Sequence, residues 1–184
     1  MMLGSWVLLW VALAVSIPDA VVQTEEINMG YFPSVTGHNI NGVRYDLPSA
    51  FEGEYNLVLM AFTQDQQFTV NSWLNALRAL EAEQASLRVY ELPTLTHQFN
   101  WVQRRTLDYW MNNGIRDATA RHTTITLYTD LRAMQDALGY ADMSTVRLYL
   151  VDRTGEVHWE SEGAYSSTKL DSLKQTLTNL SAAV

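Results

Sequence analysis

Cysteine is absent from the 184-residue chain. Without it the chain can form no disulfide, offer no thiolate to a metal and perform no thiol catalysis. Basic residues are also few, because 12 Lys and Arg stand against 20 Asp and Glu and give a formal net charge of −8. Phosphate backbones bind basic surfaces, so this balance argues against nucleic acid as a partner.

Several chemical motifs are missing as well. The chain contains no G-x-S-x-G elbow, no G-x-G-x-x-G fingerprint and no P-loop, which leaves hydrolase chemistry and nucleotide binding without support. None of the four histidines has a histidine or cysteine two to four residues further on, the spacing typical of metal ligands. We therefore expect no cofactor and no metal. The histidines are His38, His97, His122 and His158.

The N-terminus is almost entirely apolar over residues 3–17. This run is short for a membrane span but suits the hydrophobic region of a signal peptide, with cleavage near Ala14 or Ala20. An uncleaved anchor and a buried core helix are the alternatives. We expect a signal peptide or N-terminal anchor over residues 1–20, a linker over 21–34 and one domain over 35–184. The protein is then exported, and is periplasmic or membrane-associated.

Local patterns along the rest of the chain predict strands that alternate with helices. Asn41-Gly42 is a strong hairpin turn signal, and Pro93 is expected to end a strand. Asp130 and Gly139 are expected to begin and end a short helix. The expected elements are a hairpin over 35–48, strands over 57–62, 87–92, 123–128, 147–151 and 156–160, and helices over 67–84, 98–113 and 167–180.

Two segments carry a resemblance to known proteins. Residues 37–62 end in LPSAFEGEYNLVLMAF, and residues 148–157 read LYLVDRTGEV, followed by Gly163. Both resemble the TlpA and AhpC/TSA-type branches of the thioredoxin-like superfamily. The resemblance implies an α/β class with a thioredoxin-like fold, in which helices flank a central mixed β-sheet that carries an N-terminal hairpin.

Finer details are similar to the thioredoxin-like mitochondrial ATP synthase assembly-factor family. The matching features include Ser72-Trp73, Val89-Tyr90-Glu91, the paired Arg104-Arg105, Leu138-Gly139 and Val157-His158-Trp159. This resemblance implies a membrane-associated assembly factor or chaperone that is not an oxidoreductase.

The redox site of thiol members has no counterpart in this chain. Their nucleophile follows the first buried strand, where this chain reads Thr63-Gln64-Asp65-Gln66-Gln67. Their cis-proline position corresponds to Val146, before which we expect a trans peptide bond. The five polar residues are either a plain helix start capped by Thr63 or Asp65, or a polar site that attracts an anion.

A basic, aromatic-rich segment lies on an otherwise acidic chain. Residues 97–123 hold four arginines and two aspartates, whereas the rest has 8 Lys and Arg and 18 Asp and Glu. Arginine and aromatic side chains anchor interfaces and also lie at anionic membrane surfaces. Our hypothesis is a docking face made of Trp101, Arg104, Arg105 and Arg116. The alternative is that the aromatic side chains pack on the sheet while the arginines are solvated.

The sequence therefore favours a redox-inactive binding protein, either an assembly factor or a chaperone-like factor at a membrane. Its expected partner is a protein client, such as a subunit of a membrane complex. One alternative is a non-thiol enzyme that uses Thr63, Gln64 and Asp65 with a nearby histidine. Another is a structural subunit of an envelope complex.

Overall fold

The computed structural model describes residues 30–96 and 122–182. The expected signal peptide or anchor and the helix expected over 98–113 lie outside these residues. The described elements, in chain order, are β1 (Val35–Asn39), β2 (Arg44–Leu47), β3 (Tyr55–Ala61), the 3₁₀ turn η1 (Gln64–Gln66), α1 (Gln67–Glu83), β4 (Leu87–Thr96), β5 (Ile125–Thr129), α4 (Leu131–Leu138), β6 (Arg147–Asp152), β7 (Val157–Glu162) and α5 (Ser167–Ala182).

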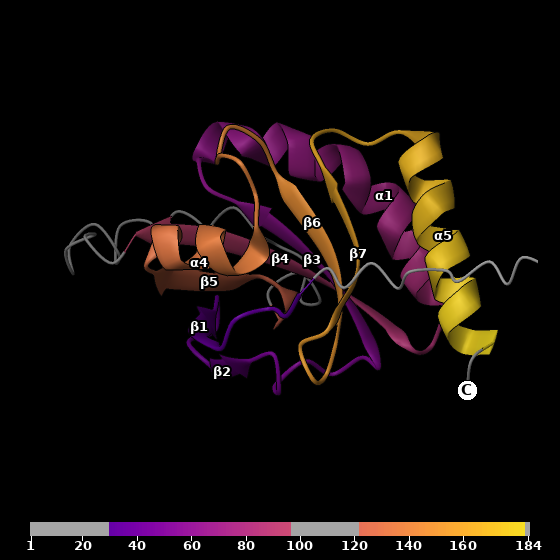
Figure 1. The fold of residues 1–184 in the computed structure, drawn as a ribbon, viewed down its shortest axis with the longest axis horizontal. Coiled ribbons are helices and arrows are strands. Elements are labelled where there is room, and N and C mark those ends of the chain that lie inside the picture. Colours follow the sequence, from indigo (N-terminus) through magenta and orange to yellow (C-terminus); the bar gives the residue numbers. More distant parts are fainter. Residues whose placement is uncertain (1–29, 97–121, 183–184) are drawn as a thin grey trace, which may run out of the picture.

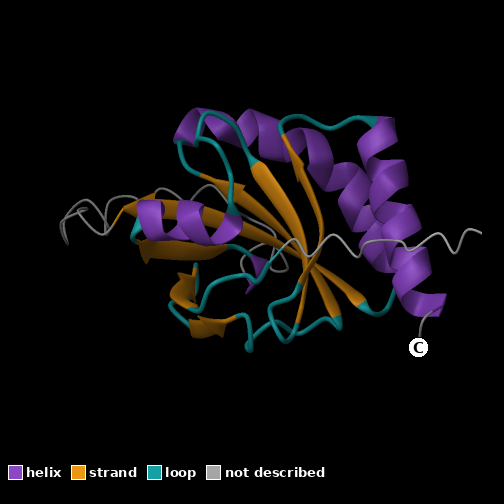
Figure 2. Ribbon diagram, viewed as in Figure 1, coloured by secondary structure: helices purple, strands orange, loops and turns teal. Residues whose placement is uncertain are grey.

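The strands form a seven-stranded mixed sheet in the order β2-β1-β5-β4-β3-β6-β7. Its three central strands, β5, β4 and β3, are parallel, and the strands on both sides pair antiparallel. Figure 2 shows the strands across the centre with helices to either side. The α/β class is therefore confirmed, and so is the N-terminal hairpin, in which β1 pairs with β2 from Val35 opposite Leu47 to His38 opposite Arg44.

Strand β3 explains why the sheet needs helices on both faces. Leu57 and Leu59 enter one core cluster, while Val58 and Met60 enter the other. All four are at most 1% exposed, which is why the segment reads as a continuous apolar run and not as an alternation.

The helices divide between these two clusters. The apolar stripe of α1 (Val70, Trp73, Leu77, Leu80) packs on the Leu57 side together with Leu170, Leu173 and Leu177 of α5. On the other side, α4 contributes Met134 and Leu138. Figure 1 shows α1 and α5 side by side and α4 apart from them. In the described residues no helix combines the length and apolarity needed to cross a membrane.

The boundaries of α4 are those that the sequence predicts. The Asp130 carboxylate accepts hydrogen bonds from the backbone N–H groups of Arg132 and Ala133, at 2.9 and 3.3 Å. Gly139 ends the helix in the left-handed region, at φ 69°. Both residues satisfy backbone groups that a helix terminus leaves without a partner.

The prediction that Pro93 ends its strand is wrong, because β4 continues to Thr96. Pro93 lies opposite Ala61, at the last paired position of β3. The strand then pairs with β5, beginning with Thr94 opposite Leu127. The proline therefore lies at the last position of β4 that pairs with β3, and its missing N–H falls where that ladder ends.

Residues before β1 also contact the sheet. Tyr31 forms an antiparallel bridge with Glu156, and the Phe32 N–H donates to the Gly155 carbonyl at 2.7 Å. The Phe32 ring is 3% exposed and meets Phe51 edge-on at a centroid distance of 6.0 Å. This short stretch closes one core cluster beside the β6–β7 hairpin.

Candidate functional site

The five polar residues aligned with the redox position lie together in the β3–α1 turn (residues 62–68). Here β3 ends, one 3₁₀ turn follows and α1 begins. Four of the five side chains are exposed and Gln66 is buried. The backbone therefore presents Thr63, Gln64, Asp65 and Gln67 to solvent at one end of the sheet.

Gln66 connects the β3–α1 turn to the loop before Val146. Its side-chain carbonyl accepts from the Phe62 N–H at 2.8 Å, and its amide donates to the Met143 carbonyl at 2.8 Å. The fold thus brings the two predicted halves of the former redox site side by side. Val146 itself is fully buried in the core, and the peptide bond before it is trans, as predicted.

The prediction that Thr63 or Asp65 caps this helix is wrong. Thr63 is the N-terminal flank of the 3₁₀ turn in an extended conformation, and its side chain makes no capping hydrogen bond. Helix α1 also begins without a side-chain cap. The buried Gln66 side chain reaches back to the strand, so it leaves the helix terminus without a cap. Asp65 adds a carboxylate to the first turn, which disfavours an anion there.

Phe68 is the feature of this turn that the sequence analysis missed. Its side chain is 84% exposed on the first turn of α1. Ser72, one turn further on, accepts a hydrogen bond from the Tyr165 N–H at 3.1 Å, and the half-exposed Tyr165 ring stands edge-on to Trp73. The available signal was periodicity, because Phe68 falls off the stripe that begins at Val70. A large exposed aromatic side chain therefore marks the surface of the former redox site.

Glu91 is a buried carboxyl group that contacts this turn. It lies on β4 opposite Leu59, and its carboxylate is 3.4 Å from the Gln67 side-chain amide. Burial raises the pKa of Glu91, and the Gln67 contact and the charge of Arg78 oppose that rise. Among the described residues, no hydrogen bond or ion pair joins a histidine to Thr63, Gln64 or Asp65. The described residues thus supply two carboxyl groups here, Asp65 and Glu91, and pair neither of them with a histidine.

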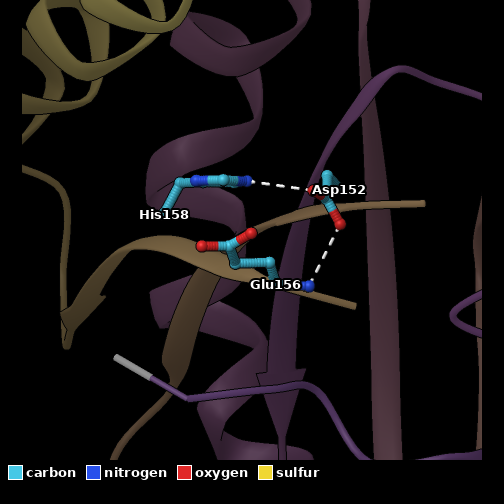
Figure 3. A group of neighbouring side chains, drawn as sticks. All are labelled: Asp152, Glu156 and His158. Carbon is cyan, nitrogen blue, oxygen red and sulfur yellow. Dashed lines mark hydrogen bonds and ion pairs between the residues drawn. The ribbon is translucent and has the colours of Figure 1, made fainter. Parts of the chain in front are cut away.

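A second group of polar side chains lies at the opposite end of the sheet, in the β6–β7 turn (residues 152–158). Asp152 pairs with Tyr55 at the start of β3, whereas α1 follows the end of that strand. Asp152, Glu156 and His158 offer ligand atoms within 4.8 Å of one another (Figure 3). The spacing of histidine and cysteine residues alone does not reveal this group, because its other two members are carboxylates. The available signal was Glu156-x-His158 after a tight turn.

All four residues of the predicted docking face lie outside the described residues. They are Trp101, Arg104, Arg105 and Arg116.

Comparison with known proteins supports the fold and goes no further. No family model matches the chain. No curated protein matches it either. Solved structures with a similar fold are thiol proteins and their relatives, so the fold is thioredoxin-like. The finer likeness to the ATP synthase assembly-factor family receives no support from these comparisons.

Three of those structures illustrate the range. BsSco, of the Sco family of cytochrome c oxidase assembly proteins, has a TM-score of 0.55 at 14% identity over 84% of this chain and 95% of its own. The exposed lipoprotein thioredoxin Etrx1 of Streptococcus pneumoniae has a TM-score of 0.53 at 12% identity over 78% of this chain and 99% of its own. A thiol peroxidase from Chromobacterium violaceum has a TM-score of 0.50 at 15% identity over 83% of this chain and 86% of its own.

Proposed function

We propose that this protein is an exported, redox-inactive thioredoxin-like protein that binds a client protein at a membrane, as an assembly factor or a chaperone-like factor. The observation that carries the proposal is the complete absence of cysteine on a thioredoxin-like fold. Disulfide exchange requires a thiolate nucleophile, and the Thr63–Gln67 stretch offers only hydroxyl, amide and carboxylate groups. The loss of that nucleophile supports a role in binding.

The exposed Phe68 supports a binding role for the β3–α1 turn. An aromatic side chain that is 84% exposed gains little from folding but can bury a large apolar area in a complex. Tyr165, another exposed aromatic residue, donates its backbone N–H to Ser72, which lies one helical turn after Phe68. Tyrosine and phenylalanine are enriched in the buried centres of interfaces.

Two further parts of the proposal rest on the sequence. The apolar residues 3–17 support export, and the similarity to the ATP synthase assembly-factor family supports an assembly role. The predicted docking face of Trp101, Arg104, Arg105 and Arg116 is the second proposed contact. If alanine replacements at these four positions leave client capture and membrane association unchanged, that face is not used.

Site-directed photo-crosslinking in cells tests the proposal. A photoreactive phenylalanine analogue replaces Phe68 in one variant and Val43, which is 49% exposed in the β1–β2 hairpin, in the other. We expect one discrete cross-linked protein from position 68 and not from position 43. No adduct at position 68, or the same adducts at both positions, would contradict binding through this surface.

A non-thiol enzyme at the same turn is the second candidate, and Glu91 is the observation in its favour. A buried carboxyl group with a raised pKa is typical of general acids and bases. Enzyme chemistry needs a second group within hydrogen-bond reach of the substrate. The described residues place only the Gln67 amide against Glu91. A Glu91→Gln variant that still supports client capture would favour binding over catalysis.

A further inference from the structure

The β6–β7 turn holds three side chains whose donor atoms suit one metal ion. Asp152 and Glu156 supply carboxylate oxygens, and His158 supplies an imidazole nitrogen, all within 4.8 Å of one another. We propose that Asp152, Glu156 and His158 form a Zn²⁺ site with these side chains as three ligands. This site lies at the opposite end of the sheet from the β3–α1 turn and does not depend on the proposed function.

The spacing of the first two donors fits a common ion. His158 Nε2 and Asp152 Oδ2 are 3.2 Å apart. Two ligands at zinc's bond lengths in a tetrahedral arrangement lie about 3.3 Å apart. The same separation suits a hydrogen bond, which Zn²⁺ would replace with two metal–ligand bonds. Figure 3 shows the imidazole pointing at Asp152, with the Glu156 carboxylate beside the pair.

The Asp152 carboxylate is held in place by hydrogen bonds that use none of the proposed ligand atoms. Its Oδ1 atom accepts from the Thr154 N–H and hydroxyl, both at 2.8 Å, and from the Glu156 N–H at 3.0 Å. These bonds fix the carboxylate and leave Oδ2 directed toward His158.

His158 is oriented from its other side. The Tyr55 ring stands edge-on to the imidazole, at a centroid distance of 5.8 Å and an interplanar angle of 85°. The side chains of His158 and Asp152 are only 17% and 20% exposed. The two side chains are therefore mostly buried, and Tyr55 packs against the imidazole. Glu156 is exposed and is free to turn its carboxylate toward an ion.

The turn also carries negative charge that no nearby cation neutralises. Within residues 30–96 and 122–182, no lysine or arginine forms a salt bridge with Asp152 or Glu156. Arg153 is adjacent in sequence, but its guanidinium donates to the carbonyls of Glu52 and Gly53. Mixed nitrogen and oxygen ligands suit Zn²⁺ better than Mg²⁺ or Ca²⁺. Three protein ligands leave the fourth position to water or to a partner's ligand.

Calorimetric titration of the untagged full chain, kept soluble in a mild detergent, tests the site with ZnCl₂ and, separately, MgCl₂. We expect one Zn²⁺ per chain and no comparable Mg²⁺ binding. His158→Ala and Glu156→Gln are each expected to weaken Zn²⁺ binding by about tenfold or more. Glu156→Gln changes an exposed side chain, so it tests the site even if His158→Ala disturbs folding. Zn²⁺ is also expected to shift the imidazole NMR signals of His158 and not those of His38.

The matched controls are His38→Ala and Glu160→Gln, which change an exposed histidine on β1 and an exposed glutamate on β7. Both are expected to bind Zn²⁺ as the unaltered chain does. Failure to bind Zn²⁺ would overturn the proposal. So would binding that Glu156→Gln and His158→Ala leave unchanged, which would show an adventitious ion only.

Discussion

Gln66 and Glu91 are polar side chains that the fold buries near the β3–α1 turn. Each loses its hydrogen bonds to water on burial, and the protein replaces those bonds to a different extent at the two positions. Gln66 recovers the cost through two hydrogen bonds at 2.8 Å. Glu91 has only a long contact of 3.4 Å to Gln67. An amide that is fully bonded stabilises a fold, whereas a carboxyl with one weak partner is kept closer to its neutral form.

Gln66→Ala is expected to destabilise the protein by about 1–3 kcal/mol, because it leaves the buried Phe62 N–H without its acceptor. Chemical denaturation measures the change in the free energy of unfolding. Gln64→Ala is the control, since Gln64 is exposed in the same turn, and should change the free energy by less than about 0.5 kcal/mol. Equal losses in both variants would contradict the role given to Gln66.

Glu91→Gln is expected to change how stability depends on pH. Burial raises the pKa of Glu91, so the folded state binds the proton more tightly than the unfolded state does. Glu91 therefore contributes its full stabilisation of the folded state below the pKa it has in the unfolded chain, about 4.3. This contribution is lost as pH rises through the higher pKa of Glu91 in the folded state. The variant should lose less stability than the unaltered protein between acid and neutral pH.

Urea denaturation at a series of pH values measures this difference. Glu83→Gln is the control, because Glu83 is exposed at the end of α1 and has the same charge. It should keep the pH dependence of the unaltered chain. A Glu91→Gln variant with an unchanged pH profile would show that Glu91 titrates alike in both states.

At the scale of elements, two helices of the chain begin in opposite ways. Helix α4 begins with the Asp130 side chain bonded to two backbone N–H groups, whereas α1 follows a 3₁₀ turn and has no side-chain cap. The apolar stripe of α1 packs on the sheet over about three turns, from Val70 to Leu80. A long packed helix does not need a cap, while an eight-residue helix such as α4 depends on one more strongly.

Asp130→Ala is therefore expected to cost about 0.5–2 kcal/mol in the free energy of unfolding. Thr63→Ala removes the hydroxyl that the sequence suggests as a cap but that makes no capping bond. That variant should stay within about 0.5 kcal/mol of the unaltered protein. Thermal and chemical denaturation of the two variants, side by side, measure the difference. A larger loss in Thr63→Ala than in Asp130→Ala would contradict the assigned caps.

At the scale of the whole molecule, local patterns predicted most elements and missed contacts that depend on pairing. The hairpin at Asn41-Gly42, the buried run of β3 and the ends of α4 follow from short segments read alone. Strand β4 continues past Pro93 because Thr94 to Thr96 pair with β5 after the pairing with β3 has ended. No local pattern in the sequence reports this pairing.

The candidate sites were harder to predict for the same reason. The position of the β3–α1 turn could be predicted from the order of elements, but the burial of Gln66 depends on a loop 77 residues further on. The Asp152–His158 contact joins two strands just beyond a register shift in the β6–β7 pairing at Leu150 and Val151. Side-chain constellations that arise across strands have no spacing rule strict enough to reveal them.

The absence of cysteine makes a prediction for the whole protein. The purified chain is expected to turn over neither a dithiol nor a peroxide above the rate in buffer alone, because no residue can form the mixed disulfide or the sulfenic acid. A thiol-active thioredoxin assayed alongside confirms that the assay works. Turnover that scales with the concentration of the protein would contradict a redox-inactive role.

The central claim is that this scaffold acts by contact through the β3–α1 turn, and quantitative co-isolation tests it most directly. The protein cross-linked from position 68 is quantified in isolates of the unaltered chain, of Phe68→Ala and of Val43→Ala, which changes an exposed apolar residue in the β1–β2 hairpin. We expect Phe68→Ala to reduce its recovery at least about tenfold, as loss of a buried aromatic anchor does, and Val43→Ala to leave it unchanged. Full recovery with Phe68→Ala would contradict the claim.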